Sequence, residues 1–160
     1  MRILELHIDG YGVFRDQHVR DFGDGVVLFS GPNEAGKSTL MSFVRGVLFG
    51  FERESQAGHY PPLLGGRHGG RLVVEMRDGD EVVVERYAER GQPKAPASVV
   101  GNMSKALYSN VFAFSLAELA SLESLGSEEV RARIYSAGAG LGTRTLPEAR
   151  KAVLSNIDKL

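Results

Sequence analysis

Residues Gly31 to Ser38 have the types and the spacing that bind the phosphates of a nucleotide. The segment reads Gly-Pro-Asn-Glu-Ala-Gly-Lys-Ser, which is the P-loop pattern, and Thr39 extends it. In such a loop the backbone N–H groups turn inward around a phosphate. Lys37 is expected to reach the β and γ phosphates, and the Ser38 hydroxyl is expected to ligate Mg²⁺. The sequence therefore predicts a site for ATP or GTP with Mg²⁺.

Every residue of this loop is a predicted nucleotide ligand. The set is Gly31, Pro32, Asn33, Glu34, Ala35, Gly36, Lys37, Ser38 and Thr39. Glu34 is expected to point outward, because a carboxylate close to the phosphates would repel them. The competing interpretation is an ordinary glycine turn before a helix, but a plain turn does not need Lys and Ser directly after the second glycine.

Arg15 is a further candidate for the nucleotide site. Together with Tyr11 and Phe14 it lies where a base or ribose could stack. The alternative is that all three are surface residues of a strand, and the sequence does not separate the two interpretations.

The loop has to be held between a strand and a helix. Val26–Phe29 is a continuous apolar run, which predicts a strand buried on both faces. From Lys37 to Phe49 apolar residues recur at helical spacing, and Gly50 predicts the helix end. The positive end of the helix dipole would then point at the phosphates. The expected buried stripe of the helix is Leu40, Met41, Val44, Val47 and Leu48.

Alternating polar and apolar residues predict further strands outside this unit. They are Arg2–Ile8, Val13–Phe22, Arg71–Arg77 and Glu81–Tyr87. The last two flank Asp78-Gly79-Asp80, a hairpin signal. Glu52–Gly70, rich in Gly, Pro and His, predicts a long loop.

Helices are predicted in the C-terminal third. One is expected around Ser104–Tyr108, and a second runs from its N-cap Ser127 to about Ala137. Thr145–Glu148 reads as a capping box for a third helix that continues to Leu160.

Composition limits the class of protein. With 160 residues, 42% hydrophobic and 24% charged, the chain predicts one soluble globular domain. The formal net charge of −1 argues against nucleic-acid binding through bulk positive charge, although it allows a local basic patch. Without cysteine there is no disulfide scaffold and no Cys-ligated metal site. No apolar run is long enough to span a membrane and the N-terminus is no signal peptide, so a cytoplasmic location is the default expectation.

Other polar residues carry weaker signals. His59 and His68 flank a glycine-rich loop and could form a metal pair, but a solvated loop is the favoured interpretation because no carboxylate has ligand spacing with them. Arg86, Arg90 and Lys94 form a small basic cluster that is read as a solvated face.

The amino-acid sequence of the loop resembles that of one group of proteins. Gly31–Leu40, with Phe49-Gly50-Phe51 closing the helix, is similar to the start of the SMC/RecF/SbcC-type ABC ATPases, and within them of the YhaN-like large ATPases. Ile3–Gly10 resembles the family's first strand, and Gly69–Val74 with Val83–Arg86 resembles its antiparallel β-subdomain.

This resemblance implies a fold and an activity. The expected fold is α/β: a P-loop NTPase lobe with a mixed sheet, an antiparallel ABC-type β-subdomain and helices packed on it. Residues 1–144 would form the N-terminal lobe of a split ATPase head, and residues 145–160 the start of a coiled-coil helix. The implied partners are the C-terminal lobe of the same protein and a second head. Such heads clamp on MgATP and release on hydrolysis, usually in DNA processing or repair, so contact with DNA through the parent protein is implied as well.

Some of the family's catalytic groups are not found. No Walker B strand, signature motif or switch histidine is recognised, so the 160-residue chain alone is expected to be inactive and to belong to a larger protein. A gapless comparison of Val111–Ser124 places Ser115 at the position of the family's Q-loop glutamine. Ser115 lacks an amide, and Glu118 is a substitute candidate.

Two other functions remain open. One is a nucleotide-binding scaffold or switch that does not hydrolyse ATP. The other is a small-molecule P-loop kinase, which would need a base lid and substrate-binding arginines after the helix, where the sequence has the Arg71–Tyr87 hairpin instead.

Overall fold

The computed structural model describes residues 1–56, 58–89, 95–101, 103–113 and 115. The chain divides into two compact units, Met1–Gly101 and Asn102–Leu160. The predicted P-loop, residues 31–39, is called the phosphate loop below. It lies in the first unit, which is therefore the part that positions the candidate site.

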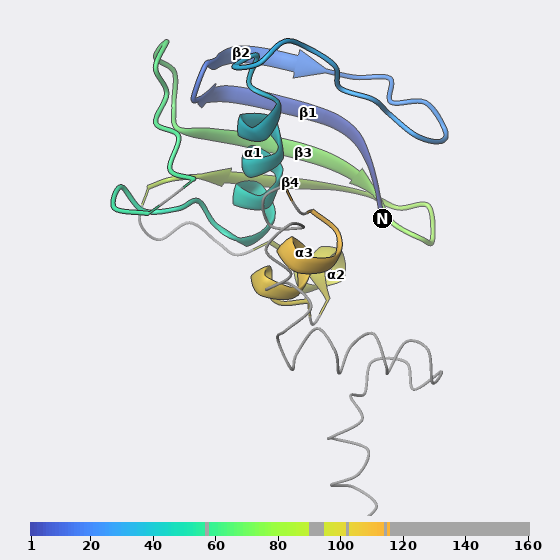
Figure 1. Cartoon of the computed structure of the whole chain (residues 1–160). Helices are drawn as coiled ribbons and strands as arrows, with labels where there is room; N and C mark the ends of the chain where they lie inside the picture. The colour runs from blue at the N-terminus through green and yellow to red at the C-terminus, as the bar shows by residue number, and fades with distance from the viewer. Residues whose placement is uncertain (57, 90–94, 102, 114, 116–160) are drawn as a thin grey trace, which may run out of the picture. The chain divides into compact units, whose positions relative to one another are not determined.

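The first unit contains a four-stranded sheet (Figure 1). Its strands are β1 (Arg2–Tyr11), β2 (Phe14–Val19), β3 (Gly69–Glu75) and β4 (Glu81–Tyr87). Their order is β2-β1-β3-β4, and every neighbouring pair is antiparallel. The predicted hairpin is confirmed: Gly79 takes a positive φ of 92° in the turn, and Met76 N–H donates to Asp80 O at 2.8 Å.

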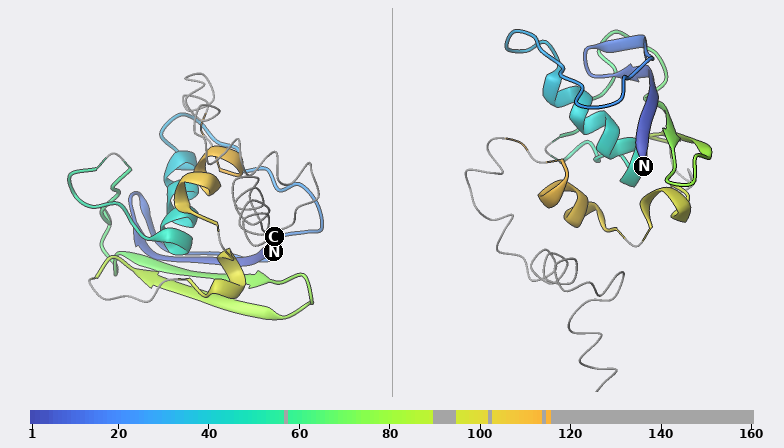
Figure 2. Two further views of the ribbon diagram at one scale, coloured as in Figure 1. Left: turned by 90° about the horizontal axis from the view of Figure 1, so that it is seen from below. Right: turned by 90° about the vertical axis from the view of Figure 1, so that its right-hand side faces the viewer.

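Helix α1 (Lys37–Phe49) covers one face of this sheet (Figure 2). It crosses the sheet from the β2 side to β4, as Figure 1 shows. The helix has the predicted bounds, and it ends where Gly50 takes a φ of 106°. The side chains buried between helix and sheet are Leu6, Ile8, Tyr11, Phe43, Val47, Leu48, Leu72, Val74 and Val84. Removing this apolar surface from water is the main force that holds α1 on the sheet.

The buried stripe of α1 differs from the predicted one. Val47 and Leu48 are buried as expected, but Leu40, Met41 and Val44 are only half-buried. The remaining core positions are Thr39, Phe43 and Gly46. Gly46 is buried because the Phe51 ring packs on it: a Cβ added there would lie 2.2 Å from the ring. The predicted stripe was based on the spacing of large apolar side chains, so it did not include a glycine on which another side chain packs.

The prediction of a buried strand at Val26–Phe29 is wrong for this structure. The segment lies outside the four strands, and Val26 is fully exposed, with Leu28 at 85%. Phe29 pairs edge-on with Phe22, with 6.1 Å between the ring centres. A strand needs neighbours to satisfy its backbone groups, and the described sheet offers it none. The expected mixed sheet is accordingly antiparallel throughout the described strands.

The other described helices are short. α2 (Ala97–Val100) belongs to the first unit, and α3 (Lys105–Val111) to the second. The helix predicted around residue 104 is confirmed, with Ser104 Oγ accepting the N-cap bond from Leu107 N–H at 3.1 Å. The predicted helices at 127–137 and 145–160 lie outside the described residues. Within the described part of the chain, no helix has the length and apolarity to cross a membrane.

Candidate nucleotide-binding site

The predicted phosphate loop leads directly into the N-terminus of α1. Gly36 is the N-cap and takes a left-handed conformation with φ 89°, which favours glycine. No side chain caps this end. The first helical hydrogen bond runs from Leu40 N–H to Gly36 O at 2.8 Å, so the N–H groups of residues 37–39 precede it. N–H groups at this position, together with the helix dipole, favour an anion.

Lys37 brings a positive charge to the same place. Its Nζ donates to Gly31 O at 2.7 Å and to Pro32 O at 2.6 Å, so the side chain folds back across the loop. Ser38 is exposed at the first turn of α1, which leaves its hydroxyl accessible. Glu34 is also exposed and has a positive φ of 68°. The exposure is compatible with the expected outward orientation of its carboxylate.

The turn between β1 and β2 packs against the end of the phosphate loop and the start of α1. A Cβ added at Gly12 would lie 2.6 Å from Thr39 Cγ2, and one added at Gly36 would lie 2.7 Å from the Phe14 ring. Both glycines thus permit close contact between the hairpin turn and the start of α1. Gly12 also forms two backbone hydrogen bonds with the loop that follows α1. Its N–H donates to Tyr60 O at 3.2 Å, and its carbonyl oxygen accepts from Leu63 N–H at 2.9 Å. These contacts were not visible as a sequence pattern.

Tyr11 and Phe14 are partners in the β1–β2 register, but the three residues proposed for base or ribose stacking do not share an exposed surface. Tyr11 is 1% exposed and packs in the core, edge-on to Phe43 at 5.6 Å between ring centres, so it is no stacking surface for a ligand. Phe14 lies against Gly36 and is half-buried. Arg15 Nη1 donates to Leu64 O at 3.0 Å. A role for Arg15 in nucleotide binding stays a prediction.

Arg86 corrects another sequence interpretation. It was expected on a solvated basic face, but it is 7% exposed, and its Nε donates to Val47 O at 2.8 Å near the C-terminal end of α1. Because side chains alternate along β4, Arg86 lies on the same face of the sheet as buried Val84. This alternation explains why Arg86 is buried and not solvated. Arg90 and Lys94 lie outside the described residues.

His59 and His68 do lie together, with ring centres 5.5 Å apart. His68 is half-buried rather than solvated, because its ring packs against those of Tyr11 and Phe51. No group of three or more potential metal ligands occurs among the residues that the structure describes. The favoured interpretation of a solvated loop is therefore wrong for His68.

The Q-loop candidates remain untested. Ser115 lies in the second unit and is half-buried, and Glu118 lies outside the described residues. The role of either residue in holding Mg²⁺ or water stays a prediction.

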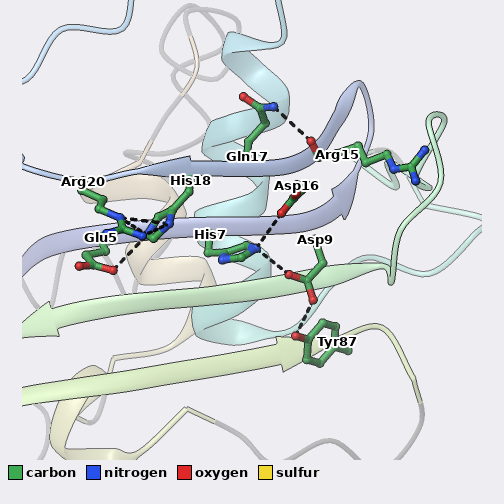
Figure 3. Close-up of polar contacts among 9 residues, drawn as sticks. All are labelled: Glu5, His7, Asp9, Arg15, Asp16, Gln17, His18, Arg20 and Tyr87. Carbon is green, nitrogen blue, oxygen red and sulfur yellow. Dashed lines mark hydrogen bonds and ion pairs between the residues drawn. The ribbon is translucent and has the colours of Figure 1, made fainter.

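Sequence reasoning missed a polar network on the sheet face opposite α1 (Figure 3). His7 Nε2 lies 3.0 Å from Asp9 Oδ1, and the His7 ring stacks on that of His18 at 5.2 Å. At the other end of the network, Tyr87 OH donates to Asp9 Oδ2 at 2.7 Å. The antiparallel register, which pairs His7 with His18, creates these contacts, and only the period-2 alternation of the strands hinted at them.

Tyr87 gives this network a measurable pH dependence. Burial, followed by the hydrogen bond to Asp9, raises the pKa of Tyr87 to about 12. The folded state therefore holds the phenol proton more tightly than the unfolded chain, in which tyrosine titrates near pH 10. The resulting stability is complete below about pH 10 and is lost as the pH rises towards 12. We expect the stability advantage of the wild type over Tyr87→Phe to shrink by about 2 kcal/mol across this window.

Urea unfolding of both proteins at several pH values across the window measures this difference. A constant difference would contradict the raised pKa. Phenolate absorbance provides the control, because Tyr87→Phe should lack a component that titrates near pH 12 in the wild type.

Comparison with known proteins identifies the family of the chain. The profile of the AAA domain family matches residues 1–160, and the chain therefore belongs to the AAA domain family. The chain is similar to the uncharacterized protein YhaN of Bacillus subtilis (strain 168), with 29% identity over 143 residues. That alignment covers 81% of this chain and 14% of YhaN, so the chain corresponds to a small part of that relative. No solved structure matches the chain.

These findings confirm the resemblance to YhaN-like proteins that the sequence of the loop indicated. They support an ATPase-type function at the coarse level of the family. They leave the roles of individual residues to physical argument.

Proposed function

We propose that the loop 31–39 binds MgATP and that the chain forms one half of a composite ATPase head. The observation that carries this proposal is the position of Lys37, whose Nζ lies within 2.7 Å of Gly31 O and Pro32 O at the uncapped start of α1. Backbone N–H groups, the helix dipole and one ammonium then converge on the place where a triphosphate would lie. Membership of the AAA domain family supports ATP as the nucleotide.

The proposed division of labour follows from the charges. Lys37 and the loop N–H groups neutralise the β and γ phosphates, and Ser38 ligates Mg²⁺, which bridges them. The groups that activate water come from a C-terminal lobe of the same protein and from a second head. ATP then holds two heads together, and hydrolysis releases them. From the family resemblance, we propose that this cycle serves DNA processing or repair.

Two apolar surfaces support the proposal of a docking C-terminal lobe. Val26–Phe29 exposes its apolar side chains and lies outside the described sheet. On α1, Leu40, Met41 and Val44 are half-buried on positions other than those that pack on the sheet. Exposed apolar patches of this kind mark interaction surfaces. A partner that supplies strands beside Val26–Phe29 would satisfy that backbone and cover those side chains.

The magnesium role of Ser38 can be tested directly. In the wild type, Mg²⁺ should tighten ATP binding, because the Ser38 hydroxyl ligates the ion that bridges the phosphates. We expect Ser38→Ala to lose about tenfold of this enhancement, and Ser38→Thr to keep it. Calorimetric titration of ATP with and without Mg²⁺ measures the ratio. An unchanged ratio in Ser38→Ala would remove Ser38 from the site.

The composite head predicts where turnover arises. The 160-residue chain alone should bind ATP with negligible hydrolysis, because we propose that the water-activating groups come from the C-terminal lobe and a second head. Addition of the C-terminal lobe should restore phosphate release. A continuous phosphate-release assay distinguishes the outcomes, and robust turnover by the chain alone would show that it holds a complete catalytic site.

A further inference from the structure

A polar cleft lies at the C-terminal end of α1, away from the phosphate loop. It has a volume of about 1030 Å³ and is lined by the loop after α1, by His59 and His68, and by the end of β4 with the residues that follow it. Since α1 has 13 residues, the cleft and the phosphate loop are separated by about 20 Å along the helix axis. The two sites can therefore be occupied independently.

Arg86 lines this cleft with unused hydrogen-bond donors. The residue is 7% exposed, and its Nε donates to Val47 O. In the described part of the chain, no hydrogen bond or ion pair joins its Nη1 or Nη2 to another group. A guanidinium stays charged at every relevant pH, and a buried charge is costly unless it is paired. The C-terminus of α1 offers only a partial negative charge of about one half, which leaves the cation incompletely compensated.

The carboxylates around the cleft do not supply the missing partner. Glu89 is held by Arg67 through two hydrogen bonds of 2.8 and 2.6 Å. Glu52 and Glu54 line the cleft as well, but neither contributes to the shift in the pKa of Arg86. Burial is the one influence on the pKa of Arg86, which it lowers. The guanidinium is thus open to an anion from outside.

His68 adds a second polar group on the same side of the sheet. The register pairs Arg86 with Gly70, two residues after His68, which makes His68 and Arg86 diagonal neighbours. His68 Nε2 is buried and has no partner within the described residues. Burial and the neighbouring His59 lower the pKa of His68, against a smaller opposing effect of a hydrogen bond with the Tyr60 backbone. An anion beside the ring would favour its protonated form and give Nε2–H an acceptor.

We propose that this cleft binds a phosphate group through Nη1 and Nη2 of Arg86, with Nε2 of His68 as the further donor. Donors that approach from two side chains suit a tetrahedral oxyanion, which presents oxygens in several directions. A carboxylate presents both oxygens in one plane and would be satisfied by Arg86 alone. The cleft is wide enough for the phosphate to be inorganic or to be carried on a larger molecule.

The test uses the 160-residue chain with Lys37→Ala, so that phosphate binding at the loop is removed. Titration with inorganic phosphate, followed by NMR of the four histidine rings, should shift the His68 signals and raise the pKa of His68. His68→Gln assigns those signals. Glycerol 3-phosphate in a parallel titration distinguishes free phosphate from a phosphate monoester, and binding of either one supports the proposal.

Two Arg86 variants complete the experiment in the same background. Arg86→Lys keeps the charge but not the two-nitrogen fork, and we expect it to weaken phosphate binding about tenfold. Arg86→Met should abolish binding, and if it fails to fold, Arg86→Lys decides. Equal affinity in Arg86→Lys, no response of His68 to either phosphate, or a response to acetate alone would each overturn the proposal. Because the readout does not involve the phosphate loop, it is independent of the proposed ATP site.

Discussion

Replacing Lys37 with alanine should weaken the binding of MgATP by about 100-fold, or ~3 kcal/mol, and leave the fold intact. Lys37 is exposed, and its two hydrogen bonds go to carbonyls of its own loop, so the core does not depend on it. Its ammonium is the side-chain cation that lies over the loop, and hydrogen bonds between charged groups are the strong ones. Calorimetric titration of ATP in the presence of Mg²⁺ measures the loss.

Arg77→Ala is the matched control for Lys37→Ala. It also removes one exposed cation, but from the β3–β4 turn, away from α1. We expect it to bind MgATP like the wild type, and both variants to keep the circular-dichroism spectrum of the wild type. Equal affinity of the wild type and Lys37→Ala would remove the phosphate loop as the nucleotide site.

Replacing Phe43 with alanine should lower the free energy of unfolding by about 4 kcal/mol. Phe43 has no exposed surface and packs against Tyr11 and Phe51, with ring centres 5.6 and 6.2 Å away. The loss combines the transfer free energy of the ring with the cavity that it leaves. Since domains of this size are stable by only about 5–15 kcal/mol, urea unfolding should show a large decrease in the midpoint concentration.

Leu63→Ala serves as the control for Phe43→Ala. Leu63 is also a large apolar residue, but it is 69% exposed, and its replacement should change stability by less than about 0.5 kcal/mol. A similar small loss for Phe43→Ala would contradict the packing of α1 on the sheet. Because α1 also carries Lys37 and Ser38, the Phe43 variant should bind ATP more weakly where it is partly unfolded.

The local parts of the structure could be predicted from the sequence. The bounds of α1, the β3–β4 hairpin and the first turn of α3 depend on residues close together in the chain, such as Gly50, Gly79 and Ser104. The phosphate loop belongs to the same class, because its spacing specifies a backbone shape and an adjacent lysine. For these elements, the residue types alone carry the information.

The surroundings of those elements could not be predicted. Gly46 is buried because Phe51 folds onto it, and Arg86 is buried because β4 turns that side chain towards α1. Val26–Phe29 is as apolar as a central strand, yet the described sheet provides no strand beside it. Each outcome depends on a partner distant in sequence, and hydropathy patterns do not record partners.

Residue types alone were enough to predict the loop 31–39, the helix that follows it and the family to which the chain belongs. The folded chain was needed to show that the Gly12 turn contacts the start of α1, that Tyr11 is a core residue, and that Arg86 lines a cleft at the far end of α1. The difference lies in the range of the interactions. Turns, caps and phosphate loops are specified by neighbouring residues, whereas burial and charge pairing depend on which surfaces the folded chain brings together.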